Sequence, residues 1–247
     1  SITIEESLRK KILYVILFLS LLLVAGSSFV NVFGLGAQVR IIKDFSLTGI
    51  NIFSLVFTLA LFFTSVPREI EQKTLYPLLA RPLRRSEYLW GKFLGNIFLV
   101  FLNLAILSIE LILILKNQTG FFQVNVFSCV FLYFVQCSVV GAFVLFFSIL
   151  FSPPLTLSLS LFVFILGNFS TVYVNYLSGQ PGNQFGGSLL KIIKEILPHF
   201  DYFDIKNSVV HDYIIDPRYF PAAVLYGAVY TWLLLVLAEM AFRNKDL

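Results

Sequence analysis

Long apolar stretches separated by short polar segments dominate the pattern along this chain. Six of the stretches reach the roughly 20 residues that a helix needs to cross the hydrocarbon core of a bilayer. They are Lys11–Phe33, Leu47–Val66, Phe93–Leu115, Val124–Phe151, Leu155–Leu177 and Pro221–Phe242. The pattern predicts an all-α membrane protein with six transmembrane helices in a single transmembrane domain over residues 1–247. An even number of spans places both termini on the same side of the membrane.

Composition supports a membrane location. The chain is 58% hydrophobic and only 13% charged, with a mean hydropathy of +0.86, which is too apolar for a domain with a water-facing surface. The net charge of +4 does not indicate nucleic-acid binding, because the basic residues cluster at the ends of apolar stretches. The expected surroundings are therefore a lipid bilayer, and no nucleic-acid partner is expected.

The distribution of Lys and Arg predicts how the chain is oriented. Eleven of the 18 basic residues fall on the side that carries both termini and the segment between the second and third stretches. Short loops rich in Lys and Arg stay in the cytosol. The sequence thus predicts a multi-pass protein of the plasma (inner) membrane with both termini and residues 67–92 in the cytosol. Residues 1–10 are expected to form a short interfacial helix on that side.

The cytosolic segment 67–92 is the most densely charged part of the chain. Apolar residues recur within it at helical spacing: Leu75, Leu78, Leu79 and Pro82. A short amphipathic helix outside the membrane is suited to a groove on a soluble partner. Pro77 and Pro82 limit such a helix to about two turns. The alternative is a solvated loop that only fixes the topology.

Two further features are candidates for function. Glu110 lies in the third stretch, where a carboxylate is costly unless it meets water or a partner. It either lines a translocation path, or reaches the outer interface or a neighbouring helix. The outer segment 178–219 contains a predicted amphipathic helix at 188–197, followed by mixed aromatic and acidic residues, which together predict an outer amphipathic or re-entrant element. Its His and Asp residues raise a metal hypothesis, but their spacing matches no compact ligand motif, so no metal site is predicted.

The order of these parts resembles a known family. The segments that carry the resemblance are ESLRKK, RIIKDFSLTGI, REIEQKT, LLARPLRRSEYLWGK, LPHFDYFDIKNSVVHD and AFRNKDL. Together they cover nearly the whole chain and look like a type-2 ABC transporter permease. The resemblance is closest to the branch tied to maturation of multicopper enzymes such as nitrous oxide reductase.

The resemblance implies a function and a set of partners. In this family the cytosolic segment between the second and third spans carries a coupling helix that fits a separate ATP-binding cassette subunit. Matched onto this sequence, the coupling residues are Glu69, Glu71, Lys73, Thr74, Leu75, Leu78, Leu79, Arg81, Pro82 and Arg85. The implied assembly contains two copies of the ATP-binding subunit, which bind ATP and Mg, and a second permease chain in a homodimer or heterodimer. The implied activity is ATP-driven transport, most often export.

The chain itself is not expected to be an enzyme or to hold a cofactor. A P-loop needs Ser or Thr after its Gly-Lys pair, whereas Gly91-Lys92 is followed by Phe93. ATP hydrolysis would therefore come from the partner subunit. The rival hypothesis is a membrane anchor or assembly factor that docks a soluble protein through residues 67–92 and transports nothing.

Overall fold

The computed structural model describes residues 11–27, 35–65, 85–121, 123–178, 198–213 and 216–243. Regular structure in these residues is helical throughout. The elements are α2 (Lys11–Ser27), α3 (Leu35–Ser65), α6 (Arg85–Thr119), α7 (Val124–Leu150), α8 (Pro153–Ser178), the 3-10 helix η1 (Phe200–Phe203), α10 (Lys206–Val210) and α11 (Tyr219–Arg243). The interfacial helix expected at 1–10 and the amphipathic helix expected at 188–197 lie outside the described residues.

Six of these helices overlap the six predicted apolar stretches. Four contain a segment long and apolar enough to cross a membrane by length and composition: Gln38–Phe63, Ser86–Thr119, Asn125–Leu150 and Tyr219–Phe242. The described apolar parts of α2 and α8 are shorter, at Leu13–Ser27 and Pro153–Asn168. The described structure is thus an all-helical membrane domain with at least four span-length helices.

Two helices begin well before the apolar stretches that predicted them. Helix α3 starts at Leu35 rather than near Leu47, so the charged residues Lys43 and Asp44 lie within the helix instead of in a loop. Helix α6 starts at Arg85 and continues for 35 residues, about 52 Å at 1.5 Å per residue. Hydropathy alone could not place these starts, because both contain polar residues that interrupt the apolar pattern.

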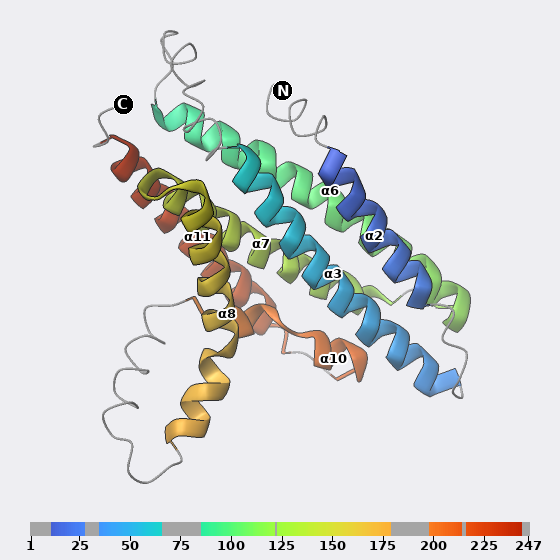
Figure 1. The fold of residues 1–247 in the computed structure, drawn as a ribbon. Coiled ribbons are helices and arrows are strands. Elements are labelled where there is room, and N and C mark those ends of the chain that lie inside the picture. Colours follow the sequence, from blue (N-terminus) through green and yellow to red (C-terminus); the bar gives the residue numbers. More distant parts are fainter. Residues whose placement is uncertain are drawn as a thin grey trace.

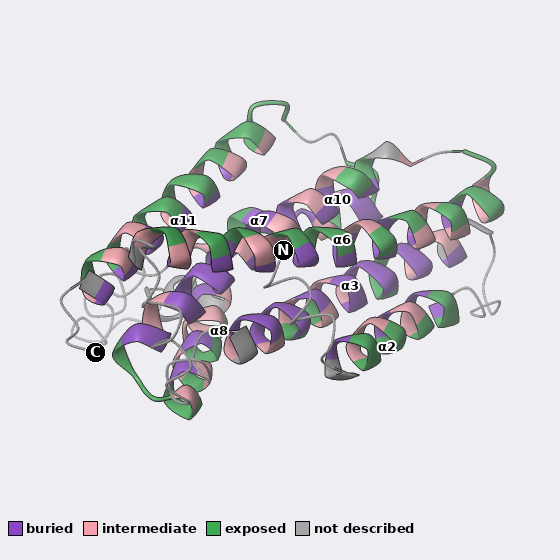
Figure 2. Cartoon of the chain, turned by 90° about the horizontal axis from the view of Figure 1, so that it is seen from above, coloured by how far each residue is buried: buried purple, intermediate pink, exposed green. Residues whose placement is uncertain are grey.

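Helix α7 occupies the centre of the bundle. It packs against α3, α6, α8 and α11 (Figure 1), and most of its surface is buried (Figure 2). Gly141 brings α3 close, because a Cβ at this position would lie 2.6 Å from the ring of Phe62. The absence of a side chain at one position thus allows two helices to approach.

Short breaks join the successive helices at the two ends of α7. Gly120 follows α6 with φ of 76°, a left-handed conformation that glycine adopts without steric cost, and its N–H donates to the carbonyl of Lys116. At the other end Phe151 is extended and α8 begins at Pro153, which fixes the first-turn geometry of the new helix. Both neighbours of α7 in the chain are therefore also its neighbours in space.

The start of α2, the end of α3, the start of α6 and the end of α11 all lie toward the same end of the bundle, at the top of Figure 1. This arrangement is what an even number of crossings requires. The described chain therefore brings its two terminal helices and both flanks of the charged segment to one side.

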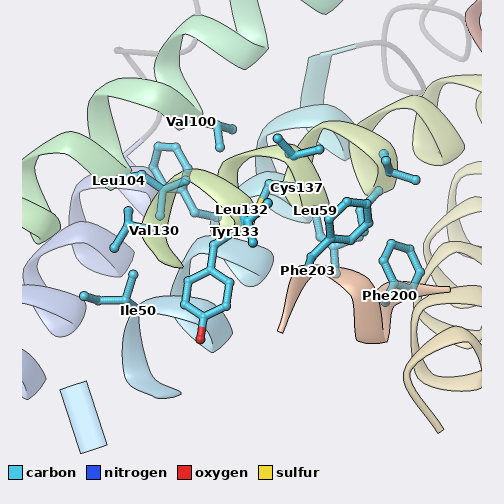
Figure 3. Close-up of a cluster of buried hydrophobic side chains, with 14 of the residues drawn as sticks. Ile50, Leu59, Val100, Leu104, Val130, Leu132, Tyr133, Cys137, Phe200 and Phe203 are labelled. Atoms are coloured by element: carbon cyan, nitrogen blue, oxygen red, sulfur yellow. The ribbon is translucent and has the colours of Figure 1, made fainter. Parts of the chain in front are cut away.

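The opposite end is closed by residues 198–213, which we call the outer plug after the side of the membrane that the sequence predicts for it. Its two short helices pack against α3, α7 and α8. Phe200 and Phe203 are 1% and 0% exposed, and their rings rise from the plug into the bundle (Figure 3). Gly167 of α8 makes room for Phe200, since a Cβ there would lie 2.6 Å from both its ring and the carbonyl oxygen of Pro198. The plug is thus an inserted part of the core.

Candidate functional site

The charged segment joins the end of α3 to the start of α6. Nine of the ten predicted coupling residues lie outside the described residues: Glu69, Glu71, Lys73, Thr74, Leu75, Leu78, Leu79, Arg81 and Pro82. The tenth, Arg85, is the first residue of α6. The structure therefore fixes the two ends of this segment, at Ser65 and Arg85, on the same side of the bundle (Figure 1).

Direct packing ties these two ends together. Phe62 near the end of α3 is fully buried, and its ring lies 5.9 Å from that of Phe93 in α6. Leu89, one turn closer to the segment, is also buried, and Lys92 lies with its Nζ 6.0 Å from the ring centroid of Tyr88. Because α3 and α6 contact each other here, a force on the segment would act on both helices at once.

Glu110 lies on α6 far from this end. It is 25 positions from Arg85, about 37 Å along the helix, so it lies far from the start of α6. Glu110 is half-buried, and its Oε2 atom is buried without a hydrogen-bond partner in the described parts of the chain. A carboxylate in this setting is costly within a membrane and is a candidate functional group.

Asn103 lies on the same face of α6 as Glu110. A separation of seven residues corresponds to nearly two helical turns, which places the two side chains in one row. Asn103 is 3% exposed, and neither atom of its amide group finds a partner among the described residues. The sequence indicated a polar residue at this position, but only the structure shows that its amide is buried and unsatisfied.

Two ion pairs fasten the outer plug to α3. The Nζ of Lys43 lies 2.8 Å from Oδ1 of Asp212 and also donates to the carbonyl of Val209 at 3.4 Å. The next residue, Asp44, accepts from Lys206 at 3.0 Å. Adjacent charges of opposite sign on α3 thus meet complementary charges at the start of α10 and just after its end. Lys43 and Asp44 lie between the first two predicted apolar stretches, so the apolar pattern did not indicate this pairing, although two adjacent charges of opposite sign were a signal.

The two ion pairs differ in burial. The Lys43 side chain is 1% exposed, whereas Lys206 and Asp44 are 23% and 54% exposed. Asp212 reaches Lys43 from a backbone with φ of 54°, a left-handed conformation that Asp tolerates better than most residues. A lysine this deeply buried needs its charge satisfied, so its partners are important for the position of the plug.

The outer His and Asp residues do not form a metal site in the described structure. No group of three or more His, Cys, Asp or Glu side chains in these parts of the chain is placed to hold a metal ion. His199 instead stacks on Tyr202, with ring centroids 5.4 Å apart, and His211 stacks on Tyr213 at 5.6 Å. Both imidazoles thus make aromatic contacts at the outer surface.

Comparison with known proteins agrees with this architecture. The family model described as "ABC-2 family transporter protein" matches residues 4–247, which include the charged segment, all the described helices and the outer plug. A comparison with curated proteins gave no match. Because the family model covers nearly the entire sequence, the chain belongs to the ABC-2 family of transporter proteins.

Proposed function

We propose that this chain is the six-span permease subunit of an ATP-driven exporter. The observation that carries the proposal is the family match over residues 4–247, since an ABC-2 protein is the membrane subunit that works with an ATP-binding subunit. The arrangement of the helices supports it, because both flanks of the charged segment lie on the same side as the ends of α2 and α11 (Figure 1). In this proposal that side faces the cytosol and the membrane is the plasma membrane.

The proposed mechanism begins at the cytosolic segment 67–84. Two ATP-binding subunits bind ATP with Mg and close on each other, and each moves the coupling helix seated on it. Helix α6 is continuous from Arg85 to Thr119, so motion at its cytosolic end is transmitted along the helix to the level of Asn103 and Glu110. Those buried polar groups would meet substrate or water in one of the two states. ATP binding shifts the equilibrium between the two arrangements of the helices, because the closed pair of ATP-binding subunits favours one of them.

The proposed assembly contains two permease chains. Large apolar side chains are exposed along α2, α6, α8 and α11, for example Phe18, Phe98, Phe162 and Trp232. Lipid covers such surfaces in a membrane, and part of them would face the second chain. The segments that carry the family resemblance favour the branch that serves multicopper enzyme maturation.

Co-purification tests the coupling role directly. The chain is co-expressed with candidate P-loop ATPase subunits, and complexes in detergent are compared for the wild type and for a variant carrying Glu71→Ala, Leu78→Asp and Arg81→Ala. The matched control carries Arg40→Ala and Arg218→Ala, two exposed arginines toward the opposite end of the bundle. We expect the wild type and the control to retain the ATPase and its hydrolysis, and the triple variant to lose both.

The other results would overturn the coupling role. If the triple variant binds the ATPase as well as the wild type does, residues 67–84 are not the docking element. If even the wild type binds no ATPase while remaining monodisperse, the non-transporting membrane anchor becomes the better explanation. Size-exclusion chromatography of each variant shows whether a loss of binding reflects unfolding.

A further inference from the structure

Two cavities lie in line along the contact between α7 and α11. The first is a polar pocket of about 420 Å³ at the outer end, lined by the start of both helices and by the plug, including Asn125, Asp212 and Asp216. The second is an apolar groove of about 340 Å³ that α6, α7 and α11 form within the membrane-spanning region. The volume of each cavity falls in the range of small-molecule binding sites.

The groove has the dimensions of a hydrocarbon chain. On α11 it extends from Val224 to Leu235, about 16 Å along the helix, which is roughly half of the 30 Å hydrocarbon core. The small residues Gly227 and Ala228 line it, as do both tryptophans of the chain, Trp90 and Trp232. Trp232 is 61% exposed and Ala228 is exposed too, so the groove opens sideways toward lipid.

One polar group in this apolar groove lacks a partner. Thr231 is 9% exposed, and its buried Oγ1 makes no hydrogen bond within the described structure. Four other helical threonines each donate to the carbonyl four residues earlier: Thr48, Thr58, Thr119 and Thr156. A hydroxyl without a partner in an apolar setting costs free energy, so Thr231 is suited to a ligand that brings an oxygen to it.

An aromatic pair links the two cavities. Phe220 lines the polar pocket and Phe131 lines the apolar groove, and their rings lie 5.7 Å apart. The described lining of the pocket includes two carboxylates and no basic side chain, together with the aromatic rings of Tyr213 and Tyr219. Since Lys43 pairs with Asp212, Asp216 supplies the negative charge that remains. The pocket therefore suits a positively charged group.

We propose that the seam between α7 and α11 binds a single-chain amphiphile with a cationic headgroup and an oxygen atom partway along its chain. The headgroup lies in the polar pocket near Asp216, the chain passes the pair Phe131 and Phe220, and the chain oxygen bonds to Thr231. The claim that this seam is the substrate site of an exporter rests on the proposed function. The claim that it binds such an amphiphile rests only on the geometry of the two cavities.

The two tryptophans allow the site to be tested without the ATPase. The chain is placed in phosphatidylcholine nanodiscs, and tryptophan quenching by a stearylamine carrying a mid-chain nitroxide is measured. Unlabelled stearylamine and its mid-chain hydroxylated form then compete for the site. We expect saturable quenching in the wild type. The hydroxylated competitor should bind about fivefold more tightly, as one net hydrogen bond of about 1 kcal/mol would give.

Matched variants decide the outcome. Ala228→Leu fills the groove and should abolish saturable quenching, whereas Ala222→Leu, an exposed position of the same helix outside the groove, should leave it intact. Thr231→Val should bind both competitors equally, and Asp216→Asn should reduce the preference for the amine over stearic acid with the same label. Quenching that does not saturate, or that Ala228→Leu leaves unchanged, would overturn the proposal, as would an unaltered preference in Thr231→Val. Since no ATPase is present, none of these failures bears on the coupling role.

Discussion

Helices α7 and α11 are nearly equal in length and similarly apolar, yet they occupy opposite environments. In the most apolar window of α7, 72% is buried within the protein, against 28% in α11. Figure 2 shows the contrast, with α7 enclosed and a broad exposed face along α11. Lipid tails are as apolar as a protein core, so hydropathy selects both helices as spans and cannot tell which one is central.

Small residues and the plug account for the difference. Gly141 and Ala142 give α7 a surface on which neighbouring helices can approach, and Phe203 fills the space beside it. On α11 the small residues Gly227 and Ala223 are buried, whereas Ala222 and Ala228 are exposed. Close packing, rather than transfer of apolar side chains from water, therefore decides which helix is central. Substitutions that change packing should therefore have different effects in the two helices.

The largest expected effect comes from the plug residue that packs against both helices. Phe203→Ala removes a fully buried ring next to Gly227, and we expect it to lower the free energy of unfolding by about 3 kcal/mol. Titration with SDS in mixed micelles measures this change. Tyr202→Ala, at the 45% exposed neighbour, should cost under about 1 kcal/mol. Equal losses at the two positions would contradict the inserted plug.

A substitution that adds volume should distinguish a central glycine from a peripheral one. Gly141→Val places atoms against Phe62 and should lower the free energy of unfolding by about 2 kcal/mol. Gly91→Val introduces the same side chain at a helical position with nothing within 4 Å of the Cβ. It should be neutral or slightly stabilising, because valine is a better helix former than glycine. The same SDS titration gives both values, and a neutral Gly141→Val would show that α3 and α7 are not in close contact.

The ion pairs of the plug should be unequal. Lys43→Met removes a buried partner and should lower the free energy of unfolding by about 1.5 kcal/mol, a modest value because Asp212 is 63% exposed and water can replace its partner. Lys206→Met disrupts the more exposed pair and should cost under about 0.5 kcal/mol. Limited proteolysis of the plug should follow the same order. A larger effect at Lys206 would reverse the roles assigned to the two pairs.

The smallest effect offers the most direct comparison of the two helices. Val140→Ala in α7 removes buried methyl groups and should cost about 1 kcal/mol, since the cavity cannot fill with lipid. Val229→Ala in α11, where the side chain is 54% exposed, should change the free energy of unfolding by less than the error of the SDS titration. If both losses are equal, the exposed face of α11 is covered by protein in the assembled transporter.

The sequence predicted the positions of the long helices because each is encoded locally. A run of apolar residues bounded by Gly120 or by Pro153 specifies a membrane helix without information from distant parts of the chain. The start of α3 was not encoded in this way. Lys43 and Asp44 interrupt the apolar pattern, and among the described residues their charges pair with those of the plug.

The candidate sites were likewise only partly predictable from the sequence. Glu110 was identifiable from its charge alone, whereas the unsatisfied states of Asn103 and Thr231 depend on which helices surround them. The Asp and His residues of the plug suggested a water-facing interface, and the burial of Phe200 and Phe203 between them was not predictable from composition. The coupling residues, which the family resemblance placed at 69–85, stay a prediction.

The pair between Lys43 and Asp212 also bears on the order in which the protein is made. The two residues are 169 positions apart, so most of the chain is synthesised after Lys43 before its partner exists. During that interval α3 carries a lysine that the finished protein buries, without the carboxylate that pairs with it. Docking of the plug is then a late step of biogenesis, and a chain interrupted before residue 198 would expose this lysine to cellular quality control.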